Sequence, residues 1–163
     1  MNYILSEKAK AHLLLHFGTT AVAGSLFDET VFPTTDSLMN YLHFRTPDQV
    51  IHQLNSNQAH VYVLHELKHC GWTGLGKRHD YNSIHTEIRN GWTVEFAYVY
   101  SFPPTNIVTV ICHETEYGLS IITAFPGEYA PPFPDPSQSK DEMEINKKYW
   151  SDHILLRKKE DLR

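Results

Sequence analysis

The strongest secondary-structure signal lies in residues 92–125, which read WTVEFAYVYSFPPTNIVTVICHETEYGLSIITAF. The Pro-containing segment 101–105 and the pair Tyr117-Gly118 divide this stretch at the spacing of hairpin loops. Strands joined by hairpins run antiparallel, so the stretch predicts an antiparallel β-meander of three to four strands. β-Branched and aromatic residues, which favour strands, dominate three runs: 92–100, 106–113 and 119–125.

Helices are predicted on both sides of the meander. Ser6 is a candidate N-cap and Gly18 a candidate stop for the first of them. The predicted fold class is therefore α+β, with N-terminal helices followed by an antiparallel β-meander and a C-terminal helix. The predicted helices cover residues 6–17, 36–43, 47–54 and 140–159.

The length of 163 residues is that of one domain, since domains commonly run ~100–200 residues. We therefore expect a single domain over residues 1–163. A helical N-terminal part covers 1–58 and a core with the sheet covers 59–127. Residues 128–163 form a Pro-rich wrap and the C-terminal helix. The five prolines within 126–136 prevent that segment from extending the sheet.

Composition excludes several classes of protein. No apolar run approaches the ~18–20 residues of a membrane span, and the N-terminus lacks the pattern of a signal peptide. The two cysteines, Cys70 and Cys112, form neither a disulfide framework nor a C-x-x-C pair. We therefore expect a soluble, cytoplasmic protein without a membrane partner.

Charge is distributed unevenly along the chain. Residues 1–136 carry seven Lys/Arg against thirteen Asp/Glu, whereas 137–163 carry seven against six. This balance excludes a global basic surface for non-specific binding of nucleic acids, and we expect no DNA partner. Residues 68–89 nevertheless contain a local group of cations, and in a cleft such a group would attract an anionic ligand whatever the net charge of the chain. These cations are Lys68, Lys77, Arg78 and Arg89, surrounded by His60, His65, His69, His79 and His85.

One candidate site within this region is a zinc centre. The residues His65-Glu66-Leu67-Lys68-His69 match H-E-x-x-H, and residues 62–70 are predicted to be helical by His65. On a helix the two histidines share a face and bind zinc, while Glu66 activates a bound water as the base. The pattern therefore predicts, as one alternative, a zinc-dependent hydrolase.

The wider pattern of short motifs points to another class of enzyme. The motifs are His65-x-x-x-His69, the basic loop Gly74–His79, His85-Thr86-Glu87 and the late strand Ile121–Pro126. In this order, over about residues 60–127, the pattern resembles the colicin D and contact-dependent-inhibition toxin nucleases of the barnase/EndoU/RelE-like ribonuclease group. The resemblance implies metal-independent cleavage of RNA, often of a tRNA or on the ribosome.

Cleavage of RNA without a metal needs a base for the 2′-hydroxyl and an acid for the leaving 5′-oxygen. It also needs positive charge to stabilise the phosphorane, which Lys77 or Arg78 supplies. His85 and Glu87, two residues apart, lie on the same side of an extended backbone and form a base–orienter pair. We expect these groups to converge in one cleft with Thr123, which donates a further hydrogen bond. The remaining candidate catalytic residues are His65 and His69.

Three functions thus stay open on the sequence alone. The first is a toxin-like, metal-independent endoribonuclease with no cofactor, which has RNA, with tRNA as a candidate, as its partner. A cognate inhibitor protein is a further candidate partner. The second is the zinc hydrolase of His65, Glu66 and His69. The third is a non-catalytic binding domain whose histidines take no part in chemistry.

Overall fold

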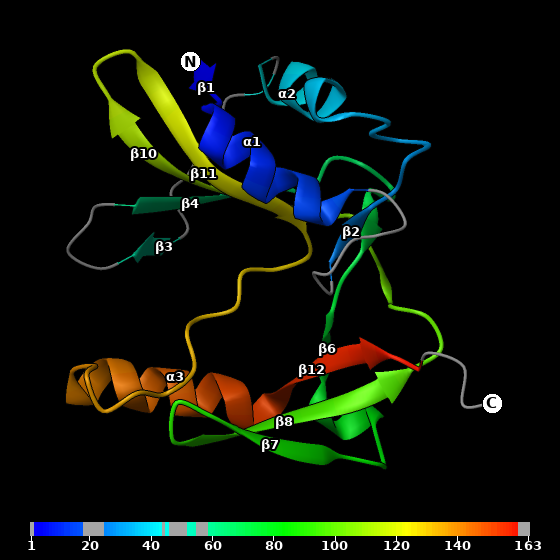
Figure 1. The fold of residues 1–163 in the computed structure, drawn as a ribbon, viewed down its shortest axis with the longest axis vertical. Coiled ribbons are helices and arrows are strands. Elements are labelled where there is room, and N and C mark those ends of the chain that lie inside the picture. Colours follow the sequence, from blue (N-terminus) through cyan, green and yellow to red (C-terminus); the bar gives the residue numbers. More distant parts are fainter. Residues whose placement is uncertain (1, 18–24, 44, 46–51, 55–58, 160–163) are drawn as a thin grey trace. The chain divides into compact units, whose positions relative to one another are not determined.

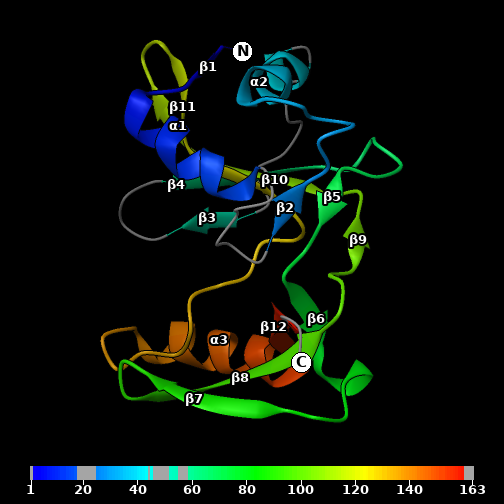
Figure 2. The same ribbon diagram turned by 45° about the vertical axis from the view of Figure 1, so that its right-hand side comes forward.

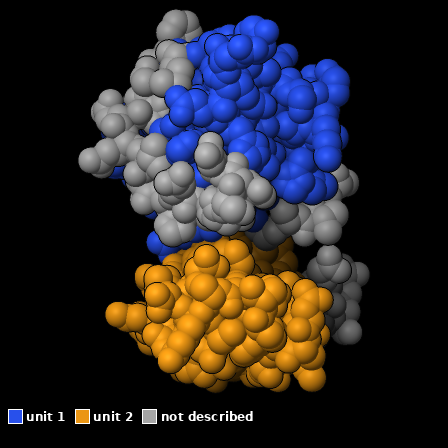
Figure 3. Space-filling view, turned by 90° about the vertical axis from the view of Figure 1, so that its left-hand side faces the viewer, with its two compact units in different colours: residues 1–73, 104–129 blue, residues 74–103, 130–163 orange. Residues whose placement is uncertain are grey.

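The computed structural model describes residues 2–17, 25–43, 45, 52–54 and 59–159. The chain forms two compact units (Figures 1 and 3), and each unit combines two separate segments. Unit 1 consists of Met1–Thr73 and Pro104–Tyr129, and unit 2 consists of Gly74–Pro103 and Ala130–Arg163. Each unit is completed by a distant part of the sequence. The expected single domain over residues 1–163 stays a prediction.

Unit 1 is built on a five-stranded sheet in the order β1-β11-β10-β4-β3. β10 and β11 form an antiparallel hairpin, and β4 pairs with the other edge of β10. A three-stranded sheet in the order β2-β5-β9 completes the unit (Figure 2). The strands are β1 (Tyr3–Ile4), β2 (Leu26–Phe27), β3 (His52–Leu54), β4 (Ala59–Leu64), β5 (Gly71–Trp72), β9 (Pro104–Thr105), β10 (Val108–Thr115) and β11 (Gly118–Pro126).

Two helices of unit 1 bury their apolar faces in its core. α1 (Glu7–Leu13) begins at the predicted cap, where Ser6 Oγ accepts a hydrogen bond from the Ala9 N–H at 3.1 Å. A 3₁₀ turn over Leu14–His16 continues α1. α2 (Thr35–His43) buries Leu38 and Leu42 completely. These leucines share a core cluster with strand residues such as Val110, so apolar packing joins the helices to the sheet.

Unit 2 contains a four-stranded sheet in the order β6-β12-β8-β7 (Figure 1). β7 and β8 form an antiparallel hairpin whose turn, Asn90-Gly91, has positive φ angles of 50° and 82°. An Asn-Gly pair with two positive φ angles is typical of a two-residue hairpin turn. A 3₁₀ turn over Arg78–Asp80 precedes β7, and α3 (Lys140–Asp152) precedes β12. The strands are β6 (Leu75–Lys77), β7 (His85–Arg89), β8 (Trp92–Val99) and β12 (His153–Lys158).

A small apolar core covers one face of the unit 2 sheet. Ala97, Ile154 and Leu156 are buried there, and Tyr81 and Ile84 pack against them. The Pro-rich segment of unit 2 lies along α3, where the Trp150 indole N–H donates to the Pro131 carbonyl at 3.1 Å. The other face of the sheet carries Phe96 and the charged side chains described below. None of the described helices is long and apolar enough to cross a membrane.

The α+β class is confirmed, but the predicted meander is wrong. Residues 108–115 and 118–126 do form a hairpin, whereas 92–99 belong to the sheet of unit 2. β8 pairs with β7 and, in parallel, with β12. Pro103 and Pro104, which lack backbone donors, lie where the chain leaves unit 2, so 101–103 is a connection to β9 rather than part of a hairpin loop. The helices are also not confined to the two ends predicted for them, because α3 is followed by a strand.

Three helix predictions also need correction. Residues 62–64 end the central strand β4, and 65–70 form a loop rather than a helix. Residues 153–158 form β12, so the C-terminal helix is shorter than predicted. Apolar runs such as Ile154-Leu155-Leu156 fit either state, and pairing with β6 and β8 made this one a strand. Residues 52–54 form β3, and the rest of the predicted helix 47–54 lies outside the described residues.

Candidate active site

His85 and Glu87 lie on one face of β7, as the spacing of two residues predicts. Their partners across the hairpin are Phe96 and Val94 of β8. Residues directly opposite each other in a sheet point to the same side, so these four side chains share a face. The prediction that His85 and Glu87 point to the same side is therefore confirmed.

Arg157 reaches the same face from β12, on the other side of β8. Its guanidinium carbon lies 3.8 Å from the centre of the Phe96 ring. Its Nη2 donates a hydrogen bond to Glu87 Oε1 at 2.5 Å, and Arg89 Nε donates to the same oxygen at 2.6 Å. We call His85, Glu87, Arg89, Phe96 and Arg157 the Phe96 cluster. Two strands that flank β8 thus send charged side chains across one aromatic ring.

The two arginines change the electrostatics of Glu87. The hydrogen bond from Arg157, followed by that from Arg89, lowers the pKa of the Glu87 carboxyl below its usual value. The carboxylate therefore stays ionised in neutral and mildly acidic solution, where it accepts hydrogen bonds. Glu87 is also the residue that holds both arginines in this position.

The imidazole of His85 lies among aromatic rings. It stacks on Phe96 with a centroid distance of 5.5 Å and meets the edge of Tyr98 at 5.1 Å. His85 remains exposed to solvent at the same time. A histidine held in place by two rings and open to solvent can exchange protons with a bound ligand.

The predicted phosphate-binding residues have partners outside this cluster. Lys77 Nζ lies 2.9 Å from His153 Nε2. Lys77 belongs to β6, which forms the opposite edge of the sheet from β7. Arg78 Nε donates to Glu95 Oε2 at 2.6 Å, and this pairing raises the pKa of Arg78. Glu95 neighbours Phe96 along β8, so its side chain leaves the opposite face of the sheet. The cations of the Phe96 cluster are instead Arg89 and Arg157. Arg89 belongs to the local group of cations in the sequence, whereas Arg157, which lies inside the helix predicted for 140–159, was not predicted.

The H-E-x-x-H motif does not form the predicted zinc face. Its residues lie in the loop after β4, where His65 is exposed and Glu66 accepts a hydrogen bond from Arg45 Nε at 2.8 Å. The i and i+4 histidines of a zinc hydrolase need a helix, and this loop is not one. Within residues 2–17, 25–43, 45, 52–54 and 59–159, no three His, Cys, Asp or Glu side chains are placed to hold a metal ion.

His69 makes a structural contact in unit 1. Its Nε2 lies 2.9 Å from Asp28 Oδ2. Hydrogen bonds from the backbone N–H and hydroxyl of Thr30, with a smaller contribution from His69, lower the pKa of Asp28. The pair joins the segment after β2 to the segment before β5, so its simplest role is to stabilise unit 1.

Burial raises the pKa of Cys70 and of Cys112 to about 12, which leaves both thiols protonated and unreactive.

Thr123 lies on β11, opposite Ile111 of β10, in unit 1. His85 belongs to the sheet of unit 2, so the two residues lie on different sheets, and their convergence in one cleft stays a prediction. The Thr123 hydroxyl is buried and has no hydrogen-bond partner among the described residues. No ligand contact is therefore assigned to Thr123.

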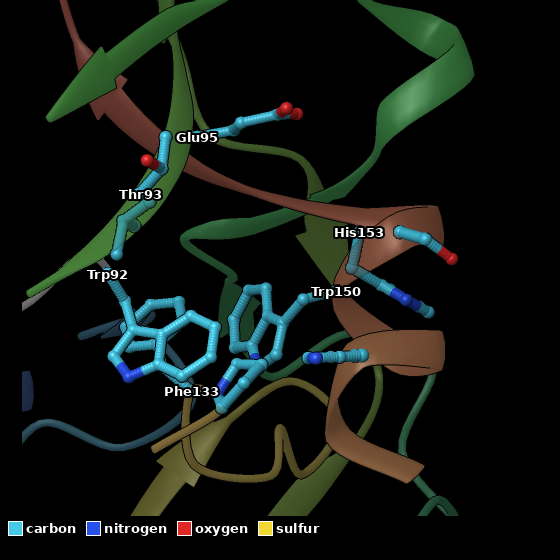
Figure 4. Close-up of a pocket in the computed structure, with 10 residues that line it drawn as sticks. Trp92, Thr93, Glu95, Phe133, Trp150 and His153 are labelled. Carbon is cyan, nitrogen blue, oxygen red and sulfur yellow. The ribbon is translucent and has the colours of Figure 1, made fainter. Parts of the chain in front are cut away.

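A pocket of about 250 Å³ lies beside the Phe96 cluster in unit 2. It lies near the junction of α3 and β12. There the pairing of β12 with β8 begins only at Phe96, so residues 92–95 of β8 pair with β7 on one edge and with no strand on the other. Figure 4 shows Trp92, Phe133 and Trp150 gathered at one end of the pocket and the Glu95 carboxylate directed away from them. The pocket is lined by Trp92, Thr93, Val94, Glu95, Phe133, Pro134, Lys147, Trp150, Ser151 and His153.

The aromatic wall of this pocket carries a cation. Lys147 Nζ lies 5.5 Å from the centre of the Trp92 ring, and the rings of Phe133 and Trp150 are 4.4 Å apart. Val94, which pairs with Glu87, lines the pocket, so pocket and cluster share β8.

Comparison with known proteins identifies no relative: the chain matches no protein-family model, no curated protein and no solved structure.

Proposed function

We propose that unit 2 is a metal-independent endoribonuclease, toxin-like in its chemistry, which cleaves RNA through the 2′-hydroxyl. The observation that carries this proposal is the Phe96 cluster. It combines an ionised carboxylate, a solvent-exposed imidazole and two guanidinium groups on one sheet face. These are the groups that the reaction needs as a base, an acid and a phosphate-binding cation.

In this mechanism Glu87 accepts the proton of the 2′-hydroxyl, and the 2′-oxygen attacks the adjacent phosphorus. His85, in its protonated form, gives a proton to the 5′-oxygen as the P–O bond breaks. The products are a 2′,3′-cyclic phosphate and a 5′-hydroxyl, so atoms and charge balance without an added reactant. Arg157 and Arg89 hold the non-bridging oxygens, because guanidinium groups bind phosphate in two-pronged fashion.

The shared arginines also explain how Glu87 becomes a stronger base when substrate binds. In the free protein Arg157 and Arg89 both donate to its carboxylate. A phosphate that binds these guanidinium groups draws them away from Glu87. Since their hydrogen bonds lower the pKa of Glu87, their departure raises it toward the pH at which the reaction runs.

The distribution of charge supports unit 2 as the part that meets RNA. Unit 2 contains ten of the 14 Lys/Arg and ten of the 19 Asp/Glu, which gives a net charge of zero. Unit 1 contains the other four and nine, for a net charge of −5. A polyanion is repelled less by the neutral unit. A tRNA substrate, a cognate inhibitor protein, a cytoplasmic location and the absence of any cofactor stay predictions.

The experiment compares wild type with His85→Ala on mixed-sequence RNA in excess EDTA. We expect wild-type cleavage that leaves 2′,3′-cyclic phosphate ends, and a loss of roughly 10²–10⁴-fold in His85→Ala. His79→Ala is the matched control, because His79 is an exposed histidine of unit 2 whose partner is Asp80. Absence of wild-type cleavage, or equal loss in His79→Ala, would contradict the proposal.

A further inference from the structure

Two tyrosines continue the Phe96 face beyond His85. Tyr98 lies on β8, two residues after Phe96, and Tyr100 follows directly after the strand. Their exposed fractions are 43% and 80%, so most of the Tyr100 ring meets solvent. Large rings that stay exposed beside a candidate site are typical of surfaces that bind a ligand.

Cations accompany these rings. Lys159 Nζ lies 4.8 Å from the centre of the Tyr100 ring, and Lys159 is two residues beyond Arg157. The Lys159 backbone N–H donates to the Val99 carbonyl at 2.7 Å, which aligns the end of β12 with the end of β8. The carboxylate of the same face, Glu87, is already paired with arginines. The surface around Tyr98 and Tyr100 is thus aromatic and positively charged.

We propose that the substrate is single-stranded RNA and that its unpaired bases stack on Tyr98 and Tyr100. This inference rests on the proposed function, since Tyr98 contacts His85 and so places a stacked base next to the reacting phosphate. Aromatic rings on a sheet bind the faces of splayed bases, which a duplex hides in its stack. Positions two apart on a strand are separated by about 7 Å, so consecutive bases of the RNA can stack on separate rings, one on Tyr98 and the next on Tyr100.

The pocket of about 250 Å³ that is lined by Trp92 lies in the opposite direction along β8 from Tyr98 and Tyr100. Trp92, Val94, Phe96 and Tyr98 occupy alternate positions of one strand, so their side chains lie on one face. The pocket volume of about 250 Å³ lies just below the ~300–1,000 Å³ of sites for drug-sized ligands, which suits a single planar base. Aromatic contacts on both sides of the Phe96 cluster fit one extended strand of RNA rather than a helix.

Binding is measured separately from cleavage, with a fluorescein-labelled 2′-O-methyl RNA of about 12 nucleotides and no self-complementarity. The methyl group blocks the attacking oxygen, so the oligonucleotide is not cleaved through it. Fluorescence anisotropy in EDTA compares the single strand with the same strand annealed to its complement. We expect the single strand to bind at least about tenfold more tightly than the duplex.

The variants Tyr98→Ala and Tyr100→Ala test the two rings. Each is expected to weaken binding of the single strand by roughly 5- to 100-fold, the range for loss of one base–aromatic stack. Tyr117→Ala is the matched control, because Tyr117 is 75% exposed but belongs to unit 1. The Tyr100 ring packs so little that its removal leaves folding intact, which circular dichroism verifies.

Equal affinity for single strand and duplex, no measurable binding, or losses no larger than in Tyr117→Ala would each overturn the inference. Unmodified RNA, incubated in parallel, tests the proposed function on its own. Cleavage that does not depend on either tyrosine leaves the function standing and removes the stacking surface. Tyrosine-dependent binding without cleavage leaves the stacking surface and removes the endoribonuclease.

Discussion

Units 1 and 2 use their aromatic and charged residues in different ways. Among the described residues, sixteen buried side chains form the core cluster of unit 1, among them Phe27 and Phe32, whose rings meet edge to face. The described part of unit 2 has a core cluster of three buried residues, and four of its aromatic rings face a cation, against one such ring in unit 1. Unit 1 therefore stabilises itself mainly by apolar burial. Unit 2 places the rings of Tyr98 and Tyr100 and several cations where a ligand can reach them.

This contrast shows where chemistry is to be expected. A phosphodiester needs positive charge, and unit 2 holds most of the cations in a small, electrically neutral body. The histidines are misleading in this respect, because eight of the eleven belong to unit 1. His69 illustrates the point, since its partner Asp28 ties two segments of unit 1 together. The neighbours of a histidine, not its abundance in the sequence, indicate its role.

The largest expected effect is the loss of cleavage in Glu87→Gln. Removal of a general base costs roughly 10²–10⁴-fold in rate, and glutamine keeps the shape of the side chain. Initial rates on a fluorogenic RNA measure it. Glu144→Gln, an exposed change on α3, is the control. Thr123→Val in unit 1 should leave the rate unchanged, and a comparable loss there would break the assignment of chemistry to unit 2.

The second effect concerns stability. Leu42 is completely buried in the core of unit 1, so Leu42→Ala should lower the free energy of unfolding by about 2–5 kcal/mol. Ile145 on α3 of unit 2 is 63% exposed, and Ile145→Ala should change it by less than about 0.5 kcal/mol. Urea unfolding followed by circular dichroism compares the two variants. Similar losses in both would contradict the burial of Leu42 in the unit 1 core or the exposure of Ile145 on α3.

A smaller effect is expected in the β7–β8 hairpin. Gly91 has φ +82°, and no atom lies near the position of an added Cβ, so strain in Gly91→Ala would be purely conformational. The left-handed region costs other residues about 1–2 kcal/mol, which sets the expected destabilisation. Thermal unfolding measures it against Ser83→Ala, an exposed change in the preceding loop. An unchanged melting temperature for Gly91→Ala would mean that this turn does not constrain unit 2.

The smallest effect is a shift in titration. Arg157 is the largest cause of the lowered pKa of Glu87, so Arg157→Gln should raise that pKa and Arg89→Gln should raise it less. Carboxyl ¹³C NMR measures both. The lowered pKa means that Glu87 stabilises the fold above the ordinary glutamate pKa and loses this contribution as the pH falls through the folded value. An unchanged pKa in Arg157→Gln would contradict the geometry of the cluster.

Local signals in the sequence predict the local structure well. Ser6 begins α1 as the predicted cap. Tyr117-Gly118 turns the β10–β11 hairpin where it is predicted to. These features depend on neighbouring residues, whose chemistry is visible in the sequence. The face shared by His85 and Glu87 follows for the same reason.

The features that were not predicted depend on partners far apart in the chain. β8 joins β12, and no pattern within 92–100 identifies a partner some sixty residues later. Arg157 was missed for this reason, although three cations directly after the apolar run Ile154-Leu155-Leu156 are an available signal. Residues 62–70 are predicted to be helical by His65, whereas β4 pairs with β10 as far as Leu64, and the residues after it form a loop.

The central claim is that the Phe96 cluster cleaves RNA through the 2′-hydroxyl without a metal. A DNA oligonucleotide with one internal ribonucleotide tests it most directly, because it offers a single attacking oxygen. In excess EDTA we expect one cut, directly after the ribonucleotide, which leaves a 2′,3′-cyclic phosphate and is lost in Glu87→Gln. No cut, cuts at deoxyribonucleotides, or a cut that EDTA stops would contradict the account.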